Sequence, residues 1–89
     1  MVKAYRKPEN SAMAESLSCF GLALKRARVA QGLSQEHLAA LAGVERGFVG
    51  KIERGEANPS LTTLEKLAKA LKRPLSELIY DYERTESEE

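Results

Sequence analysis

Apolar residues recur along this 89-residue chain at intervals of three and four, the spacing of a helix that buries one face. Alternation of apolar and polar residues, which indicates half-buried strands, is absent from the sequence. The first apolar stripe predicts a helix from Ser16 to Gln31, ending before Gly32. A polar arm at residues 1–15 precedes it, with frayed helix from Ser11 as the alternative. This stripe consists of Leu17, Phe20, Leu24 and Ala27.

Capping and helix-ending residues divide the rest of the chain into four shorter predicted helices. Ser34 and Ser60 are suited to cap helix N-termini. Glycine at positions 43 and 55 suits helix C-termini, and Pro74 prevents a helix from continuing. The predicted helices run from Ser34 to Gly43, from Glu45 to Arg54, from Ser60 to about Leu71, and onward from Pro74.

Leucine and alanine at helical spacing in these segments complete the predicted core. They are Leu38, Ala39 and Ala42, then Leu61, Leu64, Leu67, Ala68 and Leu71, and finally Leu75, Leu78 and Ile79. The last residues, YDYERTESEE, predict a tail that is mobile beyond Tyr82. The pattern therefore predicts an all-α five-helix domain at residues 16–80 and an acidic C-terminal tail at residues 81–89.

The two helices that follow Ser34 have the spacing of a pair that crosses steeply. Ala39 is small enough for the crossing point, and Gly43 can adopt the left-handed backbone that the turn between the helices requires. Apolar residues fill the space between this pair and the preceding helix: Leu38, Val44, Val49 and Ile52. The segment is therefore predicted to be a helix-turn-helix.

Two stretches, LKRARVAQGLSQEHLAALAGV and KIERGEANPSLTTLEKLAKAL, give this motif a wider context. Together they resemble the Cro and phage-repressor (XRE) family of helix-turn-helix DNA-binding domains, from about Phe20 to Ile79, roughly two thirds of the chain. The resemblance implies a compact lambda-repressor-like fold. It also implies a structural ion pair between Arg28 and Glu53, which occupy the matching positions.

The resemblance implies DNA-binding roles for several residues. The helix at 45–54 is similar to the family's recognition helix, which lies in the major groove. Gln35 and Asn58 match positions that commonly contact phosphates, and Gln35 stands at a helix N-terminus, which favours an anion. Positions that commonly contact base edges are occupied here by Arg46, Gly47 and Lys51.

Departures from the family pattern concentrate at the predicted recognition helix. Gly47 and Gly50 lie inside it and on its exposed face, where the family more often has serine or threonine, and each costs ~1 kcal/mol relative to alanine. The absent side chains of these glycines predict close approach of the backbone to DNA and more recognition of DNA shape. Glu45 and Gly50 are the positions expected at this close approach, and weak or absent DNA binding is the alternative. Lys72 occupies a position where the family often has glycine.

Charge is distributed unevenly, although the net charge is only +1. Residues 17–78 carry ten Lys and Arg against six Glu, whereas residues 79–89 carry one Arg against five acidic residues. A basic centre permits a polyanionic partner without requiring one.

Several classes of protein are disfavoured by what the sequence contains. One histidine, one cysteine and no glycine-rich phosphate loop argue against an enzyme, a bound metal or a cofactor. His37 is expected to be exposed and Cys19 to be a small packed side chain. No apolar run reaches the ~18 residues of a membrane helix, and no signal peptide is recognisable, so a cytoplasmic location is expected.

The function predicted from these observations is sequence-specific binding of double-stranded DNA by a transcriptional regulator that acts as a homodimer. The expected dimer interface comprises Leu75, Leu78, Ile79 and Tyr82, with Leu78 or Ile79 at its centre. No small-molecule substrate is expected. The alternative is a protein-interaction module or antitoxin-type partner that keeps the fold with little DNA readout. Repression, activation, autoregulation, restriction–modification control and toxin neutralisation remain open.

Overall fold

The computed structural model describes residues 9–87, which form helices and connecting turns without any strand. The helices are α1 (Glu9–Ala30), α2 (Gln35–Ala42), α3 (Phe48–Glu53), α4 (Leu61–Ala70) and α5 (Leu75–Ser87). This architecture confirms the predicted all-α five-helix fold. None of the described helices is both long and apolar enough to cross a membrane.

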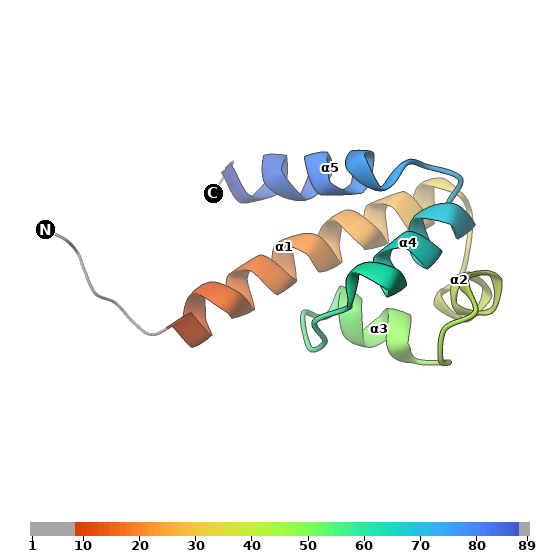
Figure 1. Ribbon diagram of the computed structural model, residues 1–89, viewed down its shortest axis with the longest axis horizontal. Helices are drawn as coiled ribbons and strands as arrows, with labels where there is room; N and C mark the ends of the chain where they lie inside the picture. Colours follow the sequence, from red (N-terminus) through yellow and green to blue (C-terminus); the bar gives the residue numbers. More distant parts are fainter. Residues whose placement is uncertain (1–8, 88–89) are drawn as a thin grey trace, which may run out of the picture.

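The long helix α1 organises the molecule. α5 lies alongside α1 and runs in the opposite direction, while α3 contacts α1 from another side (Figure 1). α2 packs against α3 and α4, and α4 contacts α5. Both members of the α2–α3 pair are therefore held by helices outside the pair.

A single apolar core joins all five helices. Its largest fully buried side chains are Leu24, Leu38, Val49, Ile52, Leu67, Leu71 and Leu78. Cys19 is also buried, as predicted. Leu61 was predicted to be buried but is 65% exposed, because it is the first residue of α4 and lies beyond the reach of the core.

Local capping explains where the central helices begin and end. The Ser34 hydroxyl accepts a hydrogen bond from the backbone N–H of His37 at 3.0 Å, and Ser60 caps Thr63 in the same way at 3.1 Å. Gly43 closes α2 with a left-handed backbone, φ 72°, as the turn requires. These caps agree with the prediction because each depends on residues three or four positions apart.

The two outer helices are longer than predicted. α1 begins at Glu9 instead of Ser16, so residues 9–15 of the predicted arm are helical, and α5 continues to Ser87 through the predicted tail. Neither extension contains glycine or proline, and adding residues to an existing helix is far easier than starting one. The rest of the predicted arm and tail, residues 1–8 and 88–89, lies outside the described residues.

The α4–α5 turn has an unusual backbone at Lys72. Its φ of 59° is the only positive value at a non-glycine residue in the described part of the chain. The turn is closed by a hydrogen bond from the Arg73 N–H to the Ala68 carbonyl at 3.1 Å. Lys72 therefore adopts the conformation that glycine adopts without strain, at a cost of about 1 kcal/mol.

Candidate nucleic-acid interface

The helix predicted to be the recognition helix is shorter than the sequence predicts, and this changes the role of its first glycine. α3 begins at Phe48, so Glu45 and Arg46 lie in the preceding turn instead of the helix. Gly47 is the N-cap residue and has a left-handed backbone, φ 88°. A side chain would strain this conformation, so the turn explains Gly47 without any helix penalty.

Gly50 lies inside α3 but is not on its exposed face, contrary to the prediction. It is buried next to two polar side chains, Gln35 and Arg54. A Cβ at this position would lie 3.1 Å from Gln35 Oε1 and 3.2 Å from Arg54 Nη1. The missing side chain therefore makes room for Gln35 and Arg54. These two side chains cover the backbone of α3 at Gly50.

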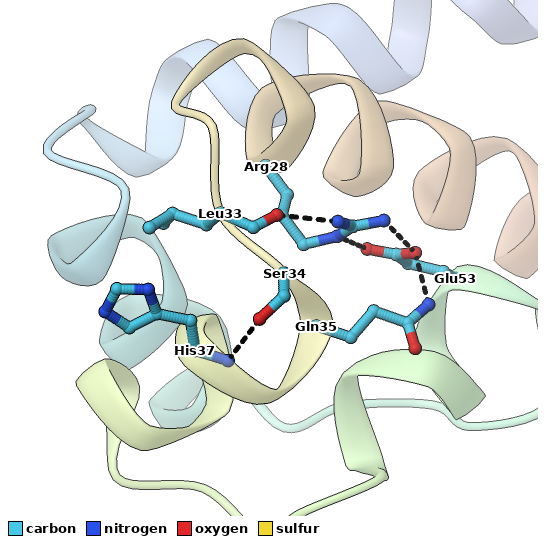
Figure 2. A network of polar contacts seen from close by, with 6 residues as sticks. All are labelled: Arg28, Leu33, Ser34, Gln35, His37 and Glu53. Carbon is cyan, nitrogen blue, oxygen red and sulfur yellow. Dashed lines mark hydrogen bonds and ion pairs between the residues drawn. The ribbon is translucent and has the colours of Figure 1, made fainter.

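The ion pair implied by the resemblance joins α1 to α3 (Figure 2). Arg28 donates from Nε and Nη2 to the Glu53 carboxylate at 2.6 and 3.1 Å, and from Nη1 to the Leu33 carbonyl at 2.7 Å. Gln35 adds a third N–H to Glu53 at 2.9 Å. Because the side chains of Arg28 and Glu53 are only 11% and 4% exposed, this network fixes α3 against α1 and the start of α2.

Gly21 contributes to the same contact, and sequence reasoning missed it. A Cβ at Gly21 would lie 2.5 Å from the Ile52 carbonyl oxygen and 2.6 Å from that of Glu53, so α1 and α3 meet backbone to backbone. The available signal was a glycine inside an apolar helical stripe, one residue after Phe20. Its partners are more than thirty residues away, so the stripe alone did not reveal the contact.

The outer side of the motif carries exposed charges that are partly paired. Arg46 donates from Nη2 to Glu36 at 2.8 Å. Arg54 donates two hydrogen bonds to Glu56, at 3.0 and 3.1 Å, which raise the pKa of Arg54 and lower that of Glu56. Lys51 is exposed on α3. This surface therefore presents guanidinium and ammonium donors to solvent.

The predicted phosphate-contacting residues lie in different surroundings. Gln35 belongs to the ion-pair network and covers Gly50. Asn58 is exposed in the α3–α4 turn, beside a shallow groove of about 200 Å³ that Ile79 and Tyr82 also line. The structure thus brings Gln35 to α3, whereas Asn58 lies next to α5.

Residues predicted at a dimer interface divide into two groups. Leu78 is fully buried within its own protomer, which corrects its expected place at the centre of an interface. Leu75, Ile79 and Tyr82 are partly buried, and the ring of Tyr82 meets that of Phe20 edge to face at 6.3 Å. Only this second group retains surface for a partner.

Metal-binding chemistry has no candidate in the described part of the chain. No group of three or more His, Cys, Asp or Glu side chains there could hold an ion. His37 is exposed, and its backbone N–H donates to the Ser34 hydroxyl that caps α2 (Figure 2).

Curated proteins similar to this chain are transcriptional regulators and control proteins. The chain is 44% identical over 52 residues to the SPbeta prophage-derived HTH-type transcriptional regulator YonR of Bacillus subtilis, covering 58% of this chain. The match spans only 48% of the length of YonR. Control protein C.MunI of a Mycoplasma species is 42% identical over 66 residues, which cover 73% of this chain and 89% of that protein.

Solved structures show the same fold. The restriction-modification controller protein C.AhdI from Aeromonas hydrophila is 50% identical, with a TM-score of 0.69, over 70% of this chain and 94% of that one.

A family model named HTH_3, described as helix-turn-helix, matches residues 24–78. The matched region contains α2, the turn and α3 in full. The chain therefore belongs to the HTH_3 family of helix-turn-helix transcriptional regulators.

Proposed function

We propose that this protein binds specific double-stranded DNA sequences as a homodimer and thereby regulates transcription. The observation that carries the proposal is the fixed geometry of the α2–α3 pair. The Arg28–Glu53 ion pair anchors the inner side of α3, while Arg46 and Lys51 face solvent at its outer side. A recognition helix held in this way can enter the major groove as a rigid element.

Each exposed group has a role in this proposal. Arg46 and Lys51 donate to base edges, for which guanine offers two acceptors. Gly47 leaves the start of α3 without a side chain, so the backbone approaches the groove closely. Gln35, at the N-terminus of α2, and Asn58, in the next turn, contact phosphates.

We further infer that the regulator is of the controller type. The chain spans 89% of C.MunI and 94% of C.AhdI, whose names describe control proteins of this kind. Control of restriction–modification genes is therefore the regulatory role that we propose ahead of a phage repressor or an antitoxin.

Dimerisation in this proposal uses α5. Leu75, Ile79 and Tyr82 retain partial exposure, and the adjoining groove of about 200 Å³ accepts side chains of a second copy. A dimer places two recognition helices about one DNA turn apart, which gives two half-sites and useful specificity.

The main experiment is selection of bound duplexes from a random library, followed by salt titration on a selected and a scrambled duplex. We expect a two-fold symmetric site, and an affinity that falls steeply with salt for both duplexes. A protein that binds neither duplex at low salt would contradict the proposal and favour an interaction module that keeps the fold.

Sedimentation of the protein at tens of micromolar tests the dimer. We expect a dimer for the unmodified chain and a folded monomer for Ile79→Asp. Tyr80→Asp is the matched control, because Tyr80 is on the same helix but outside the proposed interface, so its substitution should leave the dimer intact. A monomeric unmodified protein that binds its site tightly would contradict this part of the proposal.

A further inference from the structure

Two solvent-exposed arginine–glutamate pairs lie at opposite ends of α3. The pair of Arg46 and Glu36 joins the turn before α3 to the first turn of α2 and has side chains 76% and 69% exposed. The pair of Arg54 and Glu56 follows the C-terminal end of α3. Exposed pairs of this kind add little to stability, so a reason for the first pair is better sought in binding.

The hydrogen bonding of Arg46 leaves its guanidinium able to bind a base. Glu36 accepts a single N–H from Nη2, at 2.8 Å. A guanidinium has five N–H donors, and four of them form two edges with two parallel donors each. Whichever Nη2 proton Glu36 accepts, one complete edge remains, and two parallel donors match O6 and N7 of guanine.

The same pairing weakens the attraction of Arg46 to phosphate. A cation contributes sequence-independent affinity by neutralising a phosphate, and a carboxylate at 2.8 Å already neutralises this one. The Glu36 carboxylate is also repelled by phosphates. Arg46 therefore gains more from a base that accepts its free edge than from the DNA backbone.

We propose that Glu36 is a specificity-determining residue, which orients Arg46 toward base edges and suppresses its binding to phosphate. This inference rests on the proposed function, because it concerns how the same surface discriminates among DNA sequences. Both side chains border one shallow surface concavity of about 270 Å³, with Ala39, Ala40 and Val44. The pair therefore lies between α2 and the turn that precedes α3.

The test compares Glu36→Gln with the unmodified protein on a selected duplex and on a scrambled duplex of equal composition. We expect Glu36→Gln to bind the scrambled duplex several-fold more tightly, with a salt slope steeper by about one. We expect the ratio of selected to scrambled affinity to fall about tenfold, with the loss confined to the base pairs that Arg46 contacts.

Two controls isolate the effect. Glu56→Gln removes an equal charge from the other exposed pair and should leave the affinity ratio unchanged. In an Arg46→Ala background, Glu36→Gln should no longer change the affinity ratio, because the guanidinium that Glu36 orients is then absent. A ratio that falls equally in both backgrounds would assign the effect to charge alone and overturn the proposal.

The outcomes separate this inference from the proposed function. If the unmodified protein discriminates strongly and Glu36→Gln retains the full ratio, the role of Glu36 is overturned while the proposed function stands. If the unmodified protein binds no duplex, both are overturned.

Discussion

The proposed recognition helix has one arginine–glutamate pair on its inner face and a second pair, of similar length, at the turn that precedes it. Arg28 and Glu53 approach to 2.6 Å, and Arg46 and Glu36 to 2.8 Å. The inner pair is almost wholly shielded from water, and its carboxylate accepts three N–H groups. The outer pair is mostly exposed and shares one hydrogen bond.

This difference shows that the surroundings of an ion pair, more than its length, decide what the pair does. A buried charge that loses its partner has no water to replace it, so the inner pair holds the fold together. An exposed charge is solvated with or without its partner, so the outer pair contributes little to the stability of the fold. The first three predictions below each perturb one of these two regions.

The largest effect is expected from Glu53→Ala. Arg28 and Gln35 would lose their common acceptor in a largely buried position, so the free energy of unfolding should fall by about 3–5 kcal/mol. Thermal unfolding measures this loss. Glu36→Ala is the matched control and should change the stability by less than about 1 kcal/mol. Equal melting temperatures for both variants would show that burial does not distinguish the pairs.

A smaller loss of stability is expected from Gly21→Ala. The new Cβ would meet two backbone carbonyls of α3, which cannot move without parting the helices, so we expect a cost of about 1–3 kcal/mol. In Gly50→Ala the new Cβ would instead meet the ends of the Gln35 and Arg54 side chains, which can move away. Alanine is also a better helix former than glycine. Denaturant unfolding should therefore show little change for Gly50→Ala; a loss matching that of Gly21→Ala would contradict this reasoning.

The outer residues Arg46 and Lys51 should affect binding without affecting the fold, whereas Gln35 also donates a hydrogen bond to Glu53. Arg46→Ala and Lys51→Ala should each weaken binding to the selected duplex by about 1–3 kcal/mol, with relaxed preference at particular base pairs. Gln35→Ala and Asn58→Ala should weaken binding to all sequences alike. Fluorescence titrations on duplexes with single base-pair changes measure both effects. A uniform loss for Arg46→Ala would reassign that residue to a phosphate.

The smallest effect is expected at Lys72, which belongs to neither face. Lys72→Gly should relieve the left-handed strain and stabilise the protein by up to about 1 kcal/mol, since the greater freedom of glycine in the unfolded chain offsets part of the gain. Melting temperature and DNA affinity together test this. Altered DNA affinity would show that the α4–α5 turn is coupled to the recognition helix.

Much of the fold was predictable because it depends on local chemistry. The caps at Ser34 and Ser60 and the left-handed Gly43 each involve backbone groups three or four residues away. The pairing of Arg28 with Glu53 was predictable only through the family resemblance, because nothing local links residues 25 positions apart.

Errors at the predicted site arose where one residue type has several physical explanations. A glycine in a helical pattern can serve an exposed face, a turn or a crowded contact, and the sequence does not distinguish these. Gly47 is a turn residue and Gly50 a crowded one, although both were expected on the exposed face of a helix.

By itself the sequence determined five helices, their caps and the helix-turn-helix spacing, because hydrophobic period and capping act within a few residues. Only the tertiary structure decided which members of each stripe are covered, so that Leu78 is buried and Leu61 is not. It also decided that Gly21 meets the backbone of α3 and that Glu36 holds Arg46. These contacts depend on how helices distant in sequence cross, and the crossing is fixed by packing across the whole core.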